Sequence, residues 1–150
     1  MKTDAPPLLQ AGLHHITTHA LKKVAVDAFP TDVRRHLLFS KFLAWRDDLR
    51  KLGFSGKVWL DGSFMTEKVA PDDIDLIFWT PQTSKTLSPQ EKIIVKSLFD
   101  RANCRATFNL DLYCESPLPN QLLHRQAYWR GLFGFAHDGQ TAKGIAEVVV

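Results

Sequence analysis

One stretch, from Lys57 to Thr80, most constrains what this chain can fold into. It begins with a short β-prone segment, Lys57–Asp61, which runs directly into the pair Gly62-Ser63. The chain must turn there, and the amides and hydroxyl of a Gly-Ser turn that opens a helix can hold phosphate oxygens. A second strand, Asp73–Trp79, follows. The stretch therefore predicts a strand, a ligand-binding turn, a short helical segment and another strand.

Two carboxylates lie on one face of the second strand. Because side chains alternate along a strand, Asp73 and Asp75 share a face with Ile77 and Trp79. Two ionised carboxylates repel each other by up to roughly 4 kcal/mol at ~4 Å in an effective dielectric near ~20. Either a positive charge lies between them or one of them keeps its proton. With a phosphate-binding turn just upstream, we favour a divalent metal carrying a nucleoside triphosphate, since magnesium prefers one or two carboxylates plus phosphate oxygens.

The spacing from Gly62-Ser63 to Asp73-Ile74-Asp75-Leu76 resembles the signature of the nucleotidyltransferase superfamily, which has a polymerase-beta-like fold. The resemblance implies a third carboxylate on a later strand, and Asp111 supplies it. In residues 106–114, Asp111 shares a face with Asn109 and Tyr113. A crossover helix between the two strands would place all three carboxylates on one face of a sheet.

A narrower resemblance covers nearly the whole chain, from about Leu13 to Val150. It is to short, stand-alone nucleotidyltransferase-like proteins of bacterial genomes and prophages. This resemblance implies a role in toxin–antitoxin systems or phage–host conflict. The matching segments are WLDGSF with Thr66 and Lys68, then PDDIDL, YWRGLFGF and KGIAEV.

The resemblance also implies the roles of the site residues. Asp73, Asp75 and Asp111 would be catalytic and would bind Mg²⁺ or Mn²⁺, while Gly62, Ser63 and Lys68 would hold the triphosphate of ATP or another nucleoside triphosphate. A hydroxyl acceptor would attack the α-phosphorus and expel pyrophosphate. The acceptor could be a protein side chain, an RNA end or a small molecule, held by residues 125–134.

Two alternatives remain open at this stage. The first is a non-catalytic protein that keeps the fold to bind a nucleotide or a partner protein; exposed Trp129, Phe133 and Phe135 would favour it, whereas buried rings would be core. The second is an RNA-binding module, which predicts a clustered basic face and a steep salt dependence of binding.

Composition sets outer bounds on these ideas. The 150 residues predict one domain, residues 1–150, and the net charge of +3 is compatible with nucleotides or RNA without arguing for either. We expect a mobile or loosely docked tail over residues 1–12. That segment lacks the apolar run of a signal peptide and no stretch is long enough to span a membrane, so we expect a cytoplasmic protein.

The remaining pattern predicts an α+β fold, a mixed sheet flanked by helices. We expect Arg34 and Arg35 to belong to a solvated basic face of the longest helix. The first expected helix covers residues 13–28, and the second, the longest, is capped by Thr31 and ended by Gly53. A third helix starts with a capping box at Ser88 and ends near Asn103, and a fourth runs from Asn120 to Trp129. The last expected strand is Ile145–Val150.

Overall fold

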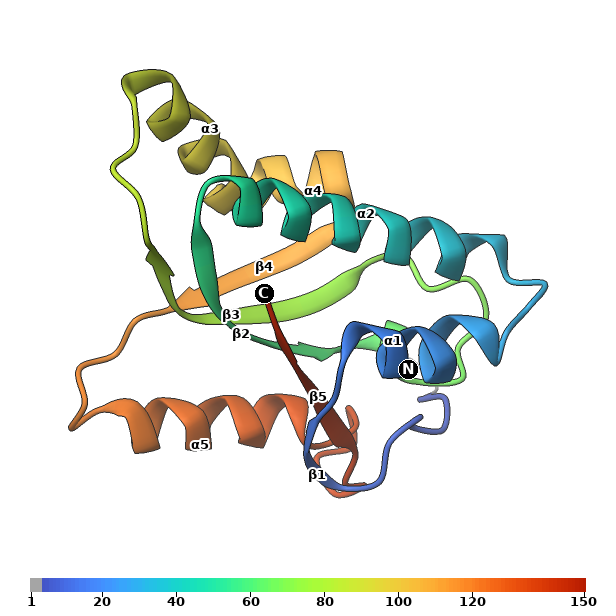
Figure 1. Cartoon of the computed structure of the whole chain (residues 1–150). Coiled ribbons are helices and arrows are strands. Elements are labelled where there is room, and N and C mark those ends of the chain that lie inside the picture. Colours follow the sequence, from blue (N-terminus) through green and yellow to red (C-terminus); the bar gives the residue numbers. More distant parts are fainter. Residues whose placement is uncertain (1–3) are drawn as a thin grey trace.

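The computed structural model describes residues 4–150 and confirms an α+β fold with a mixed sheet flanked by helices (Figure 1). Within this range the sheet has five strands in the order β1-β5-β2-β3-β4. The strands are β1 (Gly12–His15), β2 (Phe54–Asp61), β3 (Ile74–Thr83), β4 (Leu110–Glu115) and β5 (Gly144–Val149). The helices are α1 (Thr18–Lys22), the π-helix η1 (Lys23–Asp27), α2 (Val33–Lys51), the 3₁₀ turn η2 (Ser63–Met65), α3 (Pro89–Phe99), α4 (Arg101–Phe108) and α5 (Leu122–Phe133).

The expected crossover between the two acidic strands is confirmed. Strand β3 pairs in parallel with β4, and the chain between them forms α3 and α4. Ser88 caps α3 with the predicted capping box, with Pro89 in the first turn. Strand β2 is antiparallel to both β3 and β5, and β1 runs parallel to β5. The mixed pairing brings the ends of β2, β3 and β4 that carry carboxylates to the same edge of the sheet.

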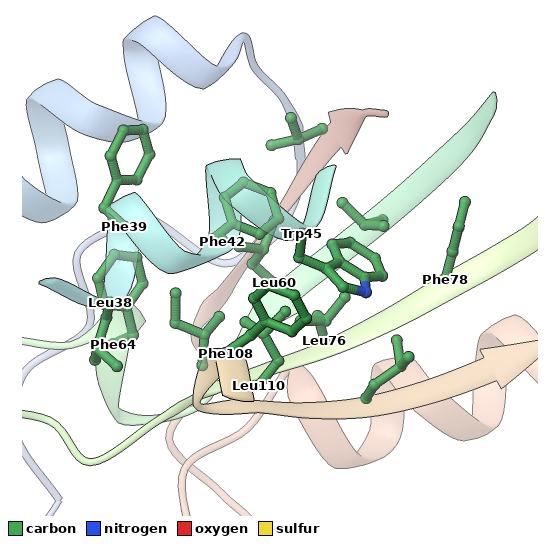
Figure 2. Packing of buried hydrophobic residues seen from close by; sticks show 14 of the residues in the cluster. Leu38, Phe39, Phe42, Trp45, Leu60, Phe64, Leu76, Phe78, Phe108 and Leu110 are labelled. Atoms are coloured by element: carbon green, nitrogen blue, oxygen red, sulfur yellow. The ribbon is translucent and has the colours of Figure 1, made fainter. Parts of the chain in front are cut away.

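The two faces of the sheet are covered differently. Figure 1 shows α2, α3 and α4 on one side and α5 on the other. The first side holds the main core, where Trp45 of α2 packs against Phe78 of β3 and donates a hydrogen bond of 3.0 Å to the Leu98 carbonyl (Figure 2). On the second side, the smaller core is built around Trp129 of α5 and the buried rings of Trp59 and Trp79. The catalytic candidates lie on this second face.

The N-terminal segment differs from expectation. The expected helix from residue 13 is wrong at its start, because Gly12–His15 is a strand that pairs with β5 and the helix begins only at Thr18. Residues 4–12 are not a loose tail, since the Leu8 amide bonds the Met65 carbonyl at 3.0 Å and the Glu67 amide bonds the Pro6 carbonyl at 2.8 Å. Residues 1–3 lie outside the described range. Pairing with a distant strand satisfied backbone groups that the local pattern assigned to a helix.

Several predicted boundaries also shift. Asp32 rather than Thr31 caps α2, because its Oδ1 accepts from the Arg35 amide at 3.1 Å. The helix predicted to run to Asn103 breaks at Asp100, whose side chain caps α4. Helix α4 then extends to Phe108, so the strand expected over residues 106–114 begins at Leu110. Helix α5 likewise runs from Leu122 to Phe133 rather than from Asn120 to Trp129. Within residues 4–150, no helix combines the length and apolar character needed to cross a membrane.

Candidate functional site

A row of aspartates crosses three neighbouring strands at one level. Asp61 on β2 is paired in register with Asp75 on β3, and Asp75 is paired with Asp111 on β4. Asp73 lies one residue before β3 begins. The structure thus gathers the three predicted carboxylates, Asp73, Asp75 and Asp111, and adds Asp61, which the sequence analysis did not select.

Charge repulsion at this row is strongest at its centre. Burial raises the pKa of Asp75 to about 6, and the charges of Asp73 and Asp111 add to the increase. Burial also raises the pKa of Asp73, again with a contribution from the charge of Asp111. Within residues 4–150, neither Asp73 nor Asp75 forms an ion pair. A cation bound between these two carboxylates would therefore relieve an existing repulsion.

Gly62 makes close contact with the central carboxylate possible. Its backbone has φ +75° and ψ −162°, a conformation that is essentially reserved for glycine. A Cβ added at Gly62 would lie 1.8 Å from Oδ2 of Asp75, which no side chain could tolerate. Gly62 was predicted to help hold a triphosphate, and in the structure its missing side chain makes room for Asp75. Ser63 opens the 3₁₀ turn η2, and within residues 4–150 its hydroxyl forms no hydrogen bond.

A buried arginine holds the turn that follows. Arg35 of α2 is fully buried, so the prediction that it belongs to a solvated basic face is wrong. Its guanidinium donates to the carbonyls of Phe64 at 2.8 Å, Thr66, and Lys68 at 2.7 Å, as well as to the Ala25 carbonyl at 3.0 Å. These bonds fix the main chain from Phe64 to Lys68 against α2.

The sequence did contain a signal for Arg35. Helical spacing places it on the same stripe as Leu38, Phe39 and Phe42, which are all buried. A cation on an apolar stripe needs partners, and main-chain carbonyls of a loop supply them. The sequence analysis grouped Arg35 with Arg34 by charge instead of by its position on the helix.

Asp111 is held by two arginines of α4. Arg101 contacts it through Nε to Oδ1 at 2.6 Å and Nη2 to Oδ2 at 3.1 Å, and Arg105 reaches Oδ2 at 2.8 Å. Burial acts to raise the pKa of Asp111, but the hydrogen bonds and charges of Arg101 and Arg105 outweigh it and lower the pKa. Across residues 4–150, no group of three or more His, Cys, Asp or Glu side chains is arranged to hold a metal ion.

The donor chemistry at Asp73 and Asp75 nevertheless fits magnesium. Both offer carboxylate oxygens that form no ion pair with a cation among the described residues, and a typical magnesium site has one or two carboxylates with phosphate oxygens. Asp111 would join them as the third predicted ligand only after release from Arg101 and Arg105.

Asp61 on β2 lies at the opposite end of the row from Asp111. It is 2% exposed, and its Oδ2 lies 3.1 Å from Nζ of Lys143. Burial raises the pKa of Asp61 to about 7 even though Lys143 opposes the shift, and its buried Oδ1 has no hydrogen-bond partner in the described part of the chain. The sequence did contain a signal for Asp61, because a carboxylate at the end of the apolar run Val58-Trp59-Leu60 needs a partner if it is buried. In the sequence analysis, Asp61 was assigned only as the last residue of the strand that precedes the Gly62-Ser63 turn.

Two lysines flank the row. Lys143 also lines a cavity of about 280 Å³ between residues 4–7 and the loop that precedes β5. Lys68, the predicted phosphate ligand, forms an exposed ion pair of 3.3 Å with Asp72. Burial raises the pKa of both Asp73 and Asp75, and the charge of Lys143 opposes the rise at Asp75 while the charges of Arg105 and Lys68 oppose it at Asp73.

The comparisons with known proteins give a family without an activity. A family model described as "Family of unknown function (DUF6932)" matches residues 1–149, and the chain belongs to that family. No curated protein and no solved structure matches the chain.

Proposed function

We propose that this protein is a magnesium-dependent nucleotidyltransferase, which moves a nucleoside monophosphate from a nucleoside triphosphate to a hydroxyl acceptor. The observation that carries the proposal is the row of carboxylates centred on Asp75. Burial, and then repulsion, raise the pKa of Asp75, and only a glycine at position 62 leaves room for its side chain. Perturbed carboxylates at the end of a sheet are typical of functional sites. The resemblance of the Gly62-to-Leu76 segment to the nucleotidyltransferase signature supplies the reaction class.

Asp73 and Asp75 are the residues we assign to the metal. Magnesium, when bound, would neutralise charge on the phosphates and lower the pKa of the attacking hydroxyl. The main chain and hydroxyl of Ser63 are assigned to phosphate oxygens, since that hydroxyl has no other partner in the described residues. Lys68 and Lys143, whose charges act on Asp73 and Asp75 respectively, are assigned to the charge of the triphosphate.

The reaction would form one phosphorus–oxygen bond and break another. The acceptor hydroxyl oxygen bonds to the α-phosphorus, the bond from that phosphorus to the bridging oxygen breaks, and pyrophosphate leaves with the electron pair. The resemblance implies Asp111 as acceptor of the hydroxyl proton. Because Arg101 and Arg105 hold its pKa low, Asp111 becomes an effective base only when those arginines move away from it, for which phosphate oxygens are suitable alternative partners.

Calorimetric titration with each of the four nucleoside triphosphates, with and without magnesium, tests the proposal. We expect magnesium-dependent binding that is lost in the Asp73→Asn, Asp75→Asn double variant. Asp72→Asn is the matched control, because Asp72 is the adjacent carboxylate and its side chain is 87% exposed. If the protein binds none of the four nucleotides in the presence of magnesium, the proposal is wrong. If it binds one, that nucleotide, labelled at its α-phosphate and added to a cell lysate, would identify the acceptor.

A second candidate is a non-catalytic nucleotide- or partner-binding protein that keeps this fold. The specific observation in its favour is that Arg101 and Arg105 both form ion pairs with Asp111, the residue predicted to be the base and the third metal ligand. Release of pyrophosphate in the presence of an acceptor separates the two functions. Nucleotide binding with no pyrophosphate release from any acceptor class would favour the non-catalytic protein.

A further inference from the structure

We propose that the acceptor is a single-stranded polynucleotide, bound along a surface that we call the arginine–aromatic strip. The strip consists of the solvent-accessible Arg101, Arg125 and Tyr128, together with the less exposed Tyr113 and the buried Trp129 that pack against them, from α4, β4 and α5. The inference rests on the proposed function, because it names the substrate that would bring a hydroxyl to Asp111.

The strip is a continuous chain of contacts that starts at the candidate site. Arg101, which binds Asp111, also donates to the Tyr113 hydroxyl at 2.7 Å and lies over the Tyr113 ring at 4.4 Å from its centroid. Tyr113 packs on Trp129 with centroids 4.8 Å apart, and Trp129 packs on Tyr128 at 5.3 Å. Arg125 lies over Tyr128, 4.6 Å from the ring centroid. A chain bound along the strip would therefore end at Asp111.

The carboxylates beneath the strip are more buried than the arginines above them. Asp111 is paired with Arg101 and Glu115 with Arg125; the acid side chains are 9% and 14% exposed, whereas the two arginines are 51% and 40% exposed. The Glu115 carboxylate also accepts from Nε1 of Trp129 at 2.8 Å. The acids thus orient the arginines in the free protein, and Arg101, Arg125 and Tyr128 are the side chains of the strip that meet solvent.

This combination matches the chemistry of single-stranded nucleic acid. Such strands bind through cations that follow the phosphates and aromatic rings on which bases stack, and arginine contributes to both. Tyr128 is 51% exposed and offers the stacking face. From Asp111 to Glu115 the strand extends roughly 13 Å at ~3.3 Å per residue, so the strip is longer than a lone phosphate requires. A duplex would hide the base faces that the rings need.

The test is fluorescence anisotropy with a labelled ten-nucleotide oligouridine, measured without nucleoside triphosphate or magnesium at several salt concentrations. We expect Tyr128→Ala to weaken binding by about 10-fold or more, since stacking on one aromatic ring has that magnitude, and Tyr128→Phe to bind as the unmodified protein does. We expect Arg125→Gln to reduce the salt slope by about 0.7, as one phosphate contact would. Arg50→Gln removes an equal charge from the exposed end of α2 and serves as the control.

Oligothymidine and a double-stranded RNA of equal length complete the design. Equal binding of the two single strands means that the 2′-hydroxyl is not read and supports the inference, as does preference for RNA. Tighter binding of the duplex, no binding of oligouridine, or a folded Tyr128→Ala variant with unchanged affinity would overturn it. Because the assay omits nucleotide and metal, its failure is separate from failure of the calorimetric test of the proposed function.

Discussion

Replacing Asp75 by asparagine isolates the electrostatics of the candidate site without any ligand. In the folded protein the pKa of Asp75 is raised from 3.8 to about 6, chiefly by burial and then by Asp73 and Asp111. A carboxyl group whose pKa is higher folded than unfolded binds its proton more tightly when folded, so its ionisation destabilises the fold. This penalty is absent below pH 3.8, grows between 3.8 and about 6, and is complete above that range.

The magnitude follows from the pKa shift. The difference between a pKa of 3.8 and one of about 6 corresponds to roughly 3 kcal/mol, and partial solvent access and salt reduce this to about 1–2 kcal/mol. Asparagine has nearly the same shape and cannot ionise. We therefore expect Asp75→Asn to raise the free energy of unfolding by about 1–2 kcal/mol more at pH 8 than at pH 4.

Urea unfolding of both proteins between pH 4 and pH 8, without divalent cations, measures the difference. Asp72→Asn is the control, since its exposed carboxylate forms only a surface ion pair and its removal should change stability little at any pH. A stability gain for Asp75→Asn that stays constant or shrinks as pH rises would refute the claim that Asp75 ionises against repulsion. Added magnesium should stabilise the unmodified protein at pH 8 and leave Asp75→Asn unaffected if the ion binds there.

Three further substitutions test the scaffold around the site. Gly62→Ala should destabilise the protein by about 3 kcal/mol or more in thermal unfolding, because the backbone at this position is strained for alanine and its Cβ collides with Asp75. A variant as stable as the unmodified protein would contradict the close contact between Gly62 and Asp75. Arg35→Gln should lower the free energy of unfolding by about 3–5 kcal/mol, since several main-chain carbonyls lose a buried charged donor. Proteolysis should then cleave within residues 63–68, and a variant that resists cleavage there would argue that Arg35 does not hold this segment. Lys143→Met leaves Asp61 buried and unpaired, so we expect a larger loss of stability at pH 8 than at pH 5, where Asp61 is protonated; a loss independent of pH would show that the ion pair is not the cause.

The parts of this fold that follow from neighbouring residues were predictable from the sequence. The capping box at Ser88 needs only its own four residues, and strand alternation places Asp75 and Ile77 on one face wherever the strand packs. A helical connection between two strands of one sheet leads to parallel pairing, which put Asp75 beside Asp111. The carboxylates at the centre of the candidate site were therefore determined by local rules and by chain order.

The partners of those carboxylates were decided only by tertiary structure. Asp61 on β2 pairs with Lys143, which immediately precedes β5, and Arg35 on α2 donates to carbonyls of the segment that follows β2. Charge pairing depends on distances of a few ångströms, which sequence separation does not encode, and a buried charge takes whichever partner packing brings within reach. The sequence by itself determined which strand faces carry acids; the packing of distant segments determined which of those acids are paired with a cation and which have no ion pair among the described residues.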